Sequence, residues 1–170
     1  MNTRSILATA FVLLGLSAAA SAQIGIYAEA TGAGVGQTFG TSNTLYFGPT
    51  VGVQYEKGHL LRLGGDFRGT ILTSNGTTTR SVVFGPRVSV HAPVLPVKPY
   101  GEFLIGVGAI KASTTTIYDN HVDYEYAIGL DSTILPHIDW RVLEYVHASY
   151  VNNGANDRNQ ISTGIVVRLF

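Results

Sequence analysis

Residues Leu45–Glu56 read Leu-Tyr-Phe-Gly-Pro-Thr-Val-Gly-Val-Gln-Tyr-Glu, and this stretch decides the fold. Apolar side chains or proline occupy every second position from Leu45 to Tyr55, while glycine, threonine, glutamine and glutamate occupy most positions between them. Successive side chains of a β-strand point to opposite faces. The period of two therefore predicts a strand with one apolar face and one face of small or polar residues.

The same period recurs along the rest of the chain, in residues 24–31, 61–71, 82–91, 102–109, 123–131, 138–149 and 160–169. Longer polar connections at 32–43, 74–79, 112–121 and 151–159 alternate with shorter ones at 57–59, 92–98 and 132–137. Eight strands of roughly 10 to 12 residues, with long loops at one end and short turns at the other, are typical of outer-membrane barrels.

The strand over Ile138–Ser149 is the least regular of the eight. Trp140, Val146 and Ala148 share a face by simple alternation, but so does Glu144. A bulge between Arg141 and Glu144 would turn both charges inward, because a bulge adds one residue to one strand of a pair.

Composition narrows the classes of protein. The chain has 170 residues, no cysteine, a formal net charge of zero and 13% charged residues. A net charge of zero disfavours nucleic-acid binding, which needs a basic surface. The lack of cysteine excludes disulfides, thiolate catalysis and cysteine-based zinc sites. A soluble surface has about 25–35% charged residues. We therefore predict an all-β, eight-stranded antiparallel up-and-down transmembrane β-barrel, with the apolar face toward lipid. A soluble lipocalin-like barrel with its apolar face inward is the alternative, because the pattern alone does not say which face is inside.

The first 22 residues predict secretion. Arg4 precedes the apolar run Ile6–Leu16, and Ala20-Ser21-Ala22 is a cleavage site of small residues. We expect a signal peptide over residues 1–22 and a barrel domain over residues 23–170, located in the cell outer membrane. The expected partners are outer-membrane lipid, lipopolysaccharide and the barrel assembly machinery, with no nucleic acid, and we expect a monomer. Phe170, an aromatic residue at the end of an alternating strand, is the expected C-terminal insertion signal.

Three stretches in the second half of the chain stand out together. They are Pro99–Glu102 with Gly106–Gly108, Ala127–Asp131 with Arg141 and Glu144-Tyr145, and Asn159–Phe170. In this order they resemble the OmpA-type outer membrane β-barrel family. The resemblance implies an eight-stranded barrel in the outer membrane, in a family whose members are mostly structural, adhesive or of unknown role.

A network of charges is predicted inside the barrel. Eight strands enclose an interior just wide enough for side chains. Charges held there are buried and need opposite partners, so we expect salt bridges that plug the lumen. A narrow ion path through re-paired charges is the functional alternative. The residues concerned are Glu29, Arg62, Asp66, Arg68, Arg87, Glu102, Asp123, Glu125, Asp131 and Arg141.

One pair of residues suggests an enzyme instead. His147 and Ser149 lie two residues apart on a strand, so they share a face, as a base and a nucleophile must. The pair resembles lipid A deacylases, which are eight-stranded outer-membrane barrels with the same His-x-Ser. That family follows its serine with asparagine and carries a glutamate about a dozen residues later. Here Tyr150 follows, and Asp157 would have to orient the imidazole. Our primary prediction is therefore non-enzymatic.

Neither a metal nor a cofactor is predicted. The five histidines are scattered, without metal-ligand spacing. Ten aromatic residues lie near the ends of predicted strands or on the apolar face, and aromatic girdles at the two membrane interfaces explain many of them. They are Tyr27, Tyr46, Tyr55, Phe67, Tyr100, Tyr124, Tyr126, Trp140, Tyr145 and Tyr150.

Overall fold

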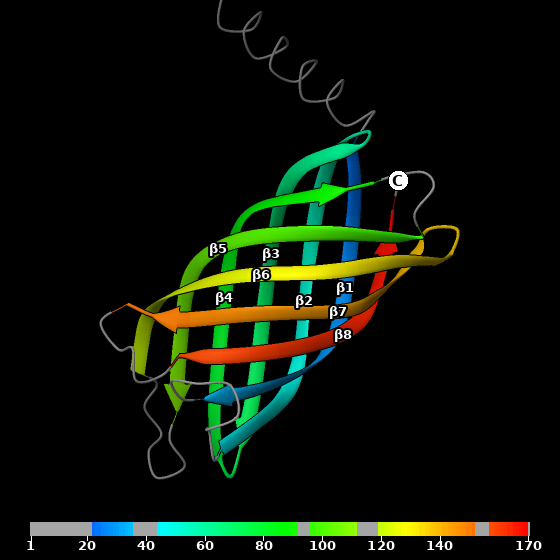
Figure 1. Ribbon diagram of the computed structural model, residues 1–170. Helices are drawn as coiled ribbons and strands as arrows, with labels where there is room; N and C mark the ends of the chain where they lie inside the picture. Colours follow the sequence, from blue (N-terminus) through cyan, green and yellow to red (C-terminus); the bar gives the residue numbers. More distant parts are fainter. Residues whose placement is uncertain (1–21, 36–43, 92–95, 112–118, 152–156, 170) are drawn as a thin grey trace, which may run out of the picture.

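Eight strands form the molecule (Figure 1). The computed structural model describes residues 22–35, 44–91, 96–111, 119–151 and 157–169, so the predicted signal peptide up to residue 21, its cleavage and Phe170 lie outside the described residues. The strands are β1 (Ala22–Val35), β2 (Thr44–Gly58), β3 (Leu61–Ser74), β4 (Thr77–Val90), β5 (Val97–Lys111), β6 (Asp119–Leu135), β7 (Ile138–Tyr150) and β8 (Arg158–Arg168).

The sheet closes on itself. Each strand pairs antiparallel with the next one in sequence, and β8 pairs antiparallel with β1 over Gly25–Val35. Closure removes every sheet edge, so the backbone groups of the strands find partners within the wall. β1 begins and β8 ends at the same end of the barrel, opposite the β3–β4 turn (Figure 1). The predicted eight-stranded antiparallel up-and-down barrel is confirmed.

None of the described residues belongs to a helix long and apolar enough to cross a membrane.

Seven of the eight strands are longer than the roughly 10 to 12 residues predicted, at 13 to 17 residues, whereas β8 has 11. β1 continues to Val35, into a stretch predicted as loop. The predicted loop at 74–79 is a two-residue turn, in which Asn75 and Gly76 have φ of 45° and 82°. Such hairpin turns need positive φ at both central residues, which Asn-Gly supplies. The ladder therefore extends through polar sequence, where backbone pairing rather than side-chain burial holds the strands.

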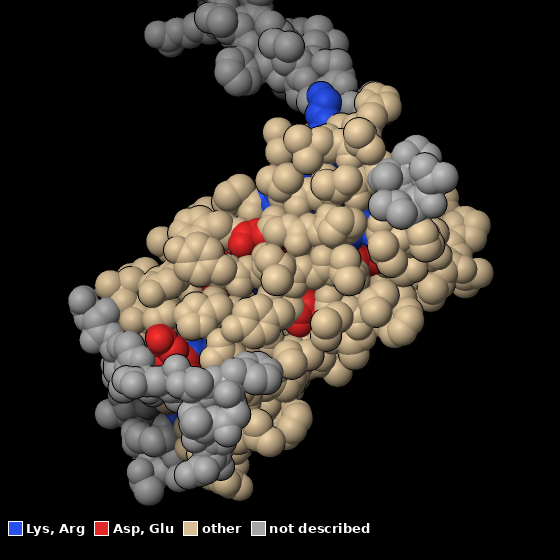
Figure 2. Space-filling view, in the orientation of Figure 1, with Lys and Arg blue, Asp and Glu red and all other residues tan. Residues whose placement is uncertain are grey.

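The two faces of the wall differ as the alternation predicts. On β4, Phe84 is 60% exposed on the outside while Arg87 is 2% exposed inside. The face of the wall in Figure 2 is mostly uncharged, with lysine, arginine and acidic side chains only in small patches. The soluble lipocalin-like alternative required the apolar face inside, and the structure turns that face outward.

The predicted bulge in β7 is present. The register with β8 shifts between Arg141 and Glu144, and the register with β6 shifts between Leu130 and Asp131. Arg141 and Glu144 are both fully buried as a result. The shift also reverses the face of the residues that follow, so Val146 and Ala148 point inward instead of joining the outward face of Trp140.

Candidate functional site

The structure places all ten predicted charges on the inner face of the barrel. Nine are buried, whereas Arg62 retains 21% side-chain exposure near the end that holds the termini. Arg62 donates to Gln23 and is 4.0 Å from Glu56, so it stands apart from most of the others. The nine that meet deeper in the lumen are Glu29, Asp66, Arg68, Arg87, Glu102, Asp123, Glu125, Asp131 and Arg141.

At the middle of the lumen, three arginines and three acids form a closed ring of alternating charge, which we call the central ring. Each acid of the ring contacts two arginines; Glu102, for example, accepts from both Arg68 and Arg87. The ring joins β3, β4, β5, β6 and β7. In order, its members are Arg68, Glu102, Arg87, Asp131, Arg141 and Glu144.

The other contacts of the central ring are ordinary charge-assisted hydrogen bonds. Asp131 accepts from Arg87 Nη2 at 3.1 Å and from Arg141 Nε at 2.9 Å. Glu144 accepts from Arg68 Nη1 at 2.9 Å and from Arg141 Nη1 at 3.4 Å. Because each carboxylate is shared, removing one arginine leaves two acids with one partner fewer, and an uncompensated buried charge costs several kcal/mol.

Residues of β1 and β2 tie the central ring to the rest of the wall. Glu29 Oε1 lies 2.5 Å from Arg141 Nη1, and Gln54 Oε1 accepts from Arg141 Nη2 at 2.8 Å. Glu56 Oε1 accepts from Arg87 Nε at 2.6 Å. The network therefore cross-links strands far apart in sequence through the lumen.

Two tyrosines complete the ring, contrary to the girdle prediction. Tyr27 and Tyr100 are 2% and 5% exposed and point into the lumen. Tyr100 donates to Glu144 at 2.7 Å, and its ring lies 3.6 Å below the guanidinium carbon of Arg87. Arg141 lies 4.4 Å over the ring of Tyr27. Stacked aromatic faces stabilise buried guanidinium groups where no acid can reach.

Glycines make room for these tyrosines. Tyr27 pairs across the ladder with Gly52, and Tyr100 pairs with Gly129. A Cβ at either glycine would collide with the tyrosine ring. The inner face of each glycine is thus covered by the neighbouring ring, which is why a residue without a side chain is needed in mid-strand.

A second charge cluster lies toward the end that carries the β3–β4 turn. Arg158 Nη2 is 2.6 Å from Asp123 Oδ2 and also donates to the hydroxyl of Tyr150. Glu125 links this cluster to the central ring, at 3.8 Å from Arg158 and 3.9 Å from Arg68. Tyr150 is likewise buried rather than part of a girdle.

A third cluster closes the end that holds the termini. Asp139 accepts from Lys98 Nζ at 2.9 Å and 3.0 Å, lies 3.1 Å from Arg168 Nε, and accepts from Thr133 at 2.7 Å. Charge pairs are therefore present at three successive levels of the lumen.

Sequence reasoning missed several of these lumen residues, although a signal existed for most. Five of them lie an even number of residues from a neighbour on the same strand that was assigned to the polar face, so simple alternation places them inside. They are Glu56, Lys98, Tyr100, Arg158 and Arg168. Glu144 could be assigned to the inner face only once the position of the bulge was known. Asp139 lies at the start of β7, where the pairing with β6 is irregular.

The proposed catalytic pair lies on the outer face of β7. His147 Nδ1 is 3.0 Å from Asn159 Oδ1, which also accepts from the Tyr145 hydroxyl at 2.7 Å. The Ser149 hydroxyl donates to Asp157. The acid that was expected to orient the imidazole thus contacts the serine, and an amide takes its place beside the histidine.

Potential metal ligands do not gather: within the described residues, no three His, Asp or Glu side chains are grouped so as to hold a metal ion.

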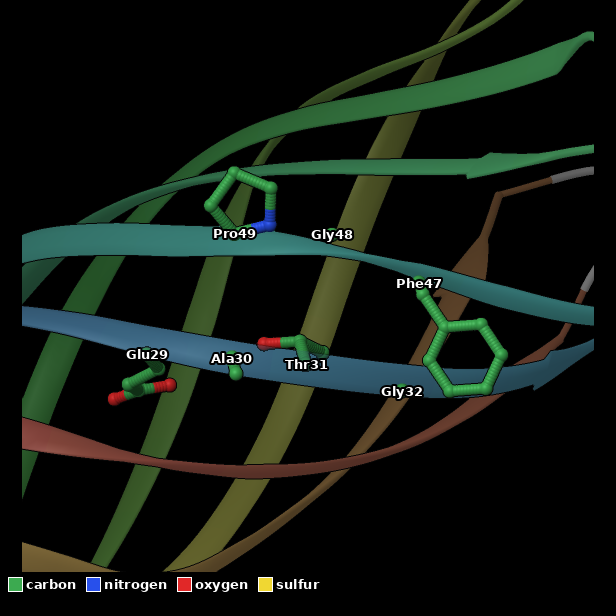
Figure 3. Close-up of a pocket in the computed structure, with 7 residues that line it drawn as sticks. All are labelled: Glu29, Ala30, Thr31, Gly32, Phe47, Gly48 and Pro49. Carbon is green, nitrogen blue, oxygen red and sulfur yellow. The ribbon is translucent and has the colours of Figure 1, made fainter.

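A hollow of about 500 Å³ lies on the outside of the wall over β1 and β2. The ring of Phe47 extends over Gly32, with Ala30 and Pro49 beside it (Figure 3). A second hollow of about 730 Å³ is lined by outward apolar residues such as Ala28, Phe67 and Ile165. Both arise where small side chains alternate with large ones. Their outward side chains are apolar, whereas Glu29 and Thr31, which also line the first hollow, are buried on the inner face.

Solved structures of outer-membrane barrels share this fold. Neisserial surface protein A is 16% identical, with a TM-score of 0.57 and coverage of 86% of this chain and 96% of that one. Ail of Yersinia pestis, solved with a heparin analogue, is 15% identical with a TM-score of 0.58, covering 88% and 99%. The outer membrane enzyme PagL is 15% identical with a TM-score of 0.53, covering 83% and 98%. No protein-family description and no curated protein sequence matches the chain.

Proposed function

We propose that the protein is an OmpA-type barrel of a bacterial outer membrane, with a structural or surface-interaction role and no catalysis. The observation that carries the proposal is the inside-out wall. Charges and hydrogen-bonding groups fill the lumen, while large apolar side chains such as Phe47, Phe84 and Ile128 are 60–64% exposed outside. A protein that folded in water would expose the opposite face.

The proposed orientation follows from the ends of the barrel. The end at which β1 begins and β8 ends would face the periplasm, and the end with the β3–β4 turn would face the exterior. Surface contacts would then involve the connections at the exterior end.

Gel mobility of an outer-membrane fraction tests the location and the fold together. A membrane barrel resists SDS, so the unheated protein should migrate differently from the boiled protein. A matched pair of single-cysteine variants sharpens the test: Val88→Cys should react with a lipid-soluble thiol reagent and Ser89→Cys should not, since Val88 is 42% exposed and Ser89 is 1% exposed. Recovery as a soluble periplasmic protein without a mobility shift would overturn the proposal.

The closed lumen has a separate readout. The central ring occupies the middle of an interior that is only wide enough for side chains. Reconstituted into a planar lipid bilayer, the barrel should pass no steady ion current. A stable, reproducible conductance would replace the plugged lumen with the narrow ion path.

A lipid A deacylase is the second candidate, favoured by one contact. The Asn159 amide oxygen holds Nδ1 of His147, which leaves Nε2 available as a base two residues from Ser149. This candidate predicts that overexpression removes an acyl chain from lipid A and that Ser149→Ala abolishes the loss. Mass spectra of lipid A that do not change on overexpression would eliminate it.

A further inference from the structure

The charged side chains that the strands place on the outer face of the barrel lie at its two ends and have one sign; Asp157, which precedes β8 and accepts from Ser149, lies outside the strands. Among the described side chains of the eight strands, every Asp and Glu points into the lumen. Three charged side chains point outward, and all are cations. Lys57 lies near the end that holds the termini, whereas Arg80 and Lys111 lie at the opposite end.

Arg80 and Lys111 are neighbours on adjacent strands. On β4 and β5, Arg80 pairs with Ala109 and Lys111 pairs with Thr78, so the two cations stand diagonally across the ladder. Diagonal side chains on one face are about 7–8 Å apart at their Cα atoms, within the joint reach of Arg and Lys. Thr78 adds a hydroxyl between them, with the Thr73 hydroxyl 3.4 Å away.

Below the two cations the wall becomes hydrocarbon-like within one step of the ladder. The next outward pair is Val82 and Val107, which are 52% and 56% exposed. The pair after that is Phe84 and Ile105, at 60% and 44%. Neighbouring outward side chains on one strand are two residues apart, which is about 7 Å along the strand. A lipid whose chains lie against these pairs would therefore bring its headgroup to the level of the cations.

We propose that Arg80 and Lys111 together bind a phosphate group of lipid A, the lipid anchor of lipopolysaccharide. The choice of leaflet rests on the orientation given under the proposed function. Both side chains also contact groups of the protein. A guanidinium has five N–H donors and an ammonium three, so each can serve a protein partner and a phosphate at once. The apolar pairs beneath favour a phosphate attached to a lipid over free phosphate.

The test uses the full barrel refolded in detergent micelles, with binding measured by native mass spectrometry. The probes are bis-phosphorylated lipid A, the same lipid A with its phosphates removed, and inorganic phosphate. The test variant is Arg80→Gln with Lys111→Gln, and Lys57→Gln is the matched control at the other end. Each of the two cations strengthens binding to an anionic lipid surface, and the loss of both should weaken binding by about thirtyfold.

The wild type and Lys57→Gln should bind bis-phosphorylated lipid A equally, and the double variant should bind it about thirtyfold more weakly. Removal of the phosphates should weaken binding to the wild type and leave the double variant unchanged. Equal binding by the wild type and the double variant, or tight binding of inorganic phosphate alone, would overturn the proposal. Heat-modifiable mobility of each variant shows that the barrel is folded, so a failure of the site is distinguishable from a failure of the proposed function.

Discussion

The inner and outer faces of the same eight strands meet opposite demands. Arg68, Arg141 and Glu144 are at most 1% exposed inside, whereas Phe47 and Ile128 are each 64% exposed outside. On the inner face, each guanidinium of the central ring shares its carboxylates with another, so these side chains are tightly coupled. The outer face needs no specific partner, because lipid chains adapt to its shape. Substitutions inside should therefore act through lost partners, and substitutions outside through polarity alone.

The largest effect is expected inside, for Arg141→Met. This change removes the partner of Glu29, Asp131 and Glu144 while keeping a side chain of some length. We expect the free energy of unfolding to fall by about 3–5 kcal/mol, because buried carboxylates lose their counter-charge. The measurement is a urea titration of the barrel in phospholipid vesicles, followed by the loss of the unheated gel band.

The control for Arg141 is Arg62→Met, which removes an arginine whose side chain is 21% exposed and whose acid partner is 4.0 Å away. Partly exposed pairs contribute about 0–1 kcal/mol. Equal losses of stability in the two variants would show that the sharing of carboxylates in the central ring adds no stability of its own.

Outside, Phe84→Arg should have the next largest effect. Phe84 lies midway along β4 and is 60% exposed, so in water an arginine there would be harmless. In a bilayer we expect a loss of about 2–4 kcal/mol, because a lipid-facing charge near the midplane is poorly solvated. The same urea titration measures it, with Phe84→Leu as the apolar control. Unchanged stability of the arginine variant would mean that this face meets water.

A smaller effect is expected where the inner face depends on a glycine. A methyl group in Gly129→Ala would collide with the ring of Tyr100. Overpacking of this kind costs about 1–3 kcal/mol. Gly101→Ala is the matched control on the neighbouring strand, since its added Cβ would meet its nearest atom at an ordinary 3.8 Å. Equal stability of the two variants would show that Tyr100 can leave Gly129 at little cost.

The smallest effect concerns His91, which follows β4 at the end that holds the termini and is only half-buried, so solvent screens the charges around it. Burial, together with the charges of Arg62 and Lys98, lowers the pKa of His91 to about 4. An unfolded histidine has a pKa of about 6.5, so it binds a proton at a higher pH than the folded one. Acidification from about pH 6.5 toward pH 4 should therefore favour unfolding, and His91→Gln should reduce this dependence. Urea midpoints at about pH 7 and about pH 4.5 measure it; an identical pH dependence in both proteins would contradict the assignment.

The sequence alone separated the apolar face of each regular strand from its polar face. Alternation along Leu45–Glu56 and its seven counterparts predicted the strands, and closure with eight of them followed from their number and the low charge content. The same alternation placed Glu29, Asp66 and Arg87 on the face opposite their apolar neighbours. This information is local, because the pleat of a strand fixes the direction of a side chain from its neighbours in sequence.

The tertiary structure alone decided which charges meet. Arg141 and Glu29 are 112 residues apart, and no local pattern links them. The bulge at Arg141 and Glu144 reverses the faces of the rest of β7, so it brings Glu144 into the central ring and leaves His147 outside. The rings of Tyr27 and Tyr100 find room in the lumen because Gly52 and Gly129 lie opposite them on neighbouring strands. Register and the stagger of the closed sheet set these contacts, and both depend on the pairing of whole strands rather than on the residues next to each side chain.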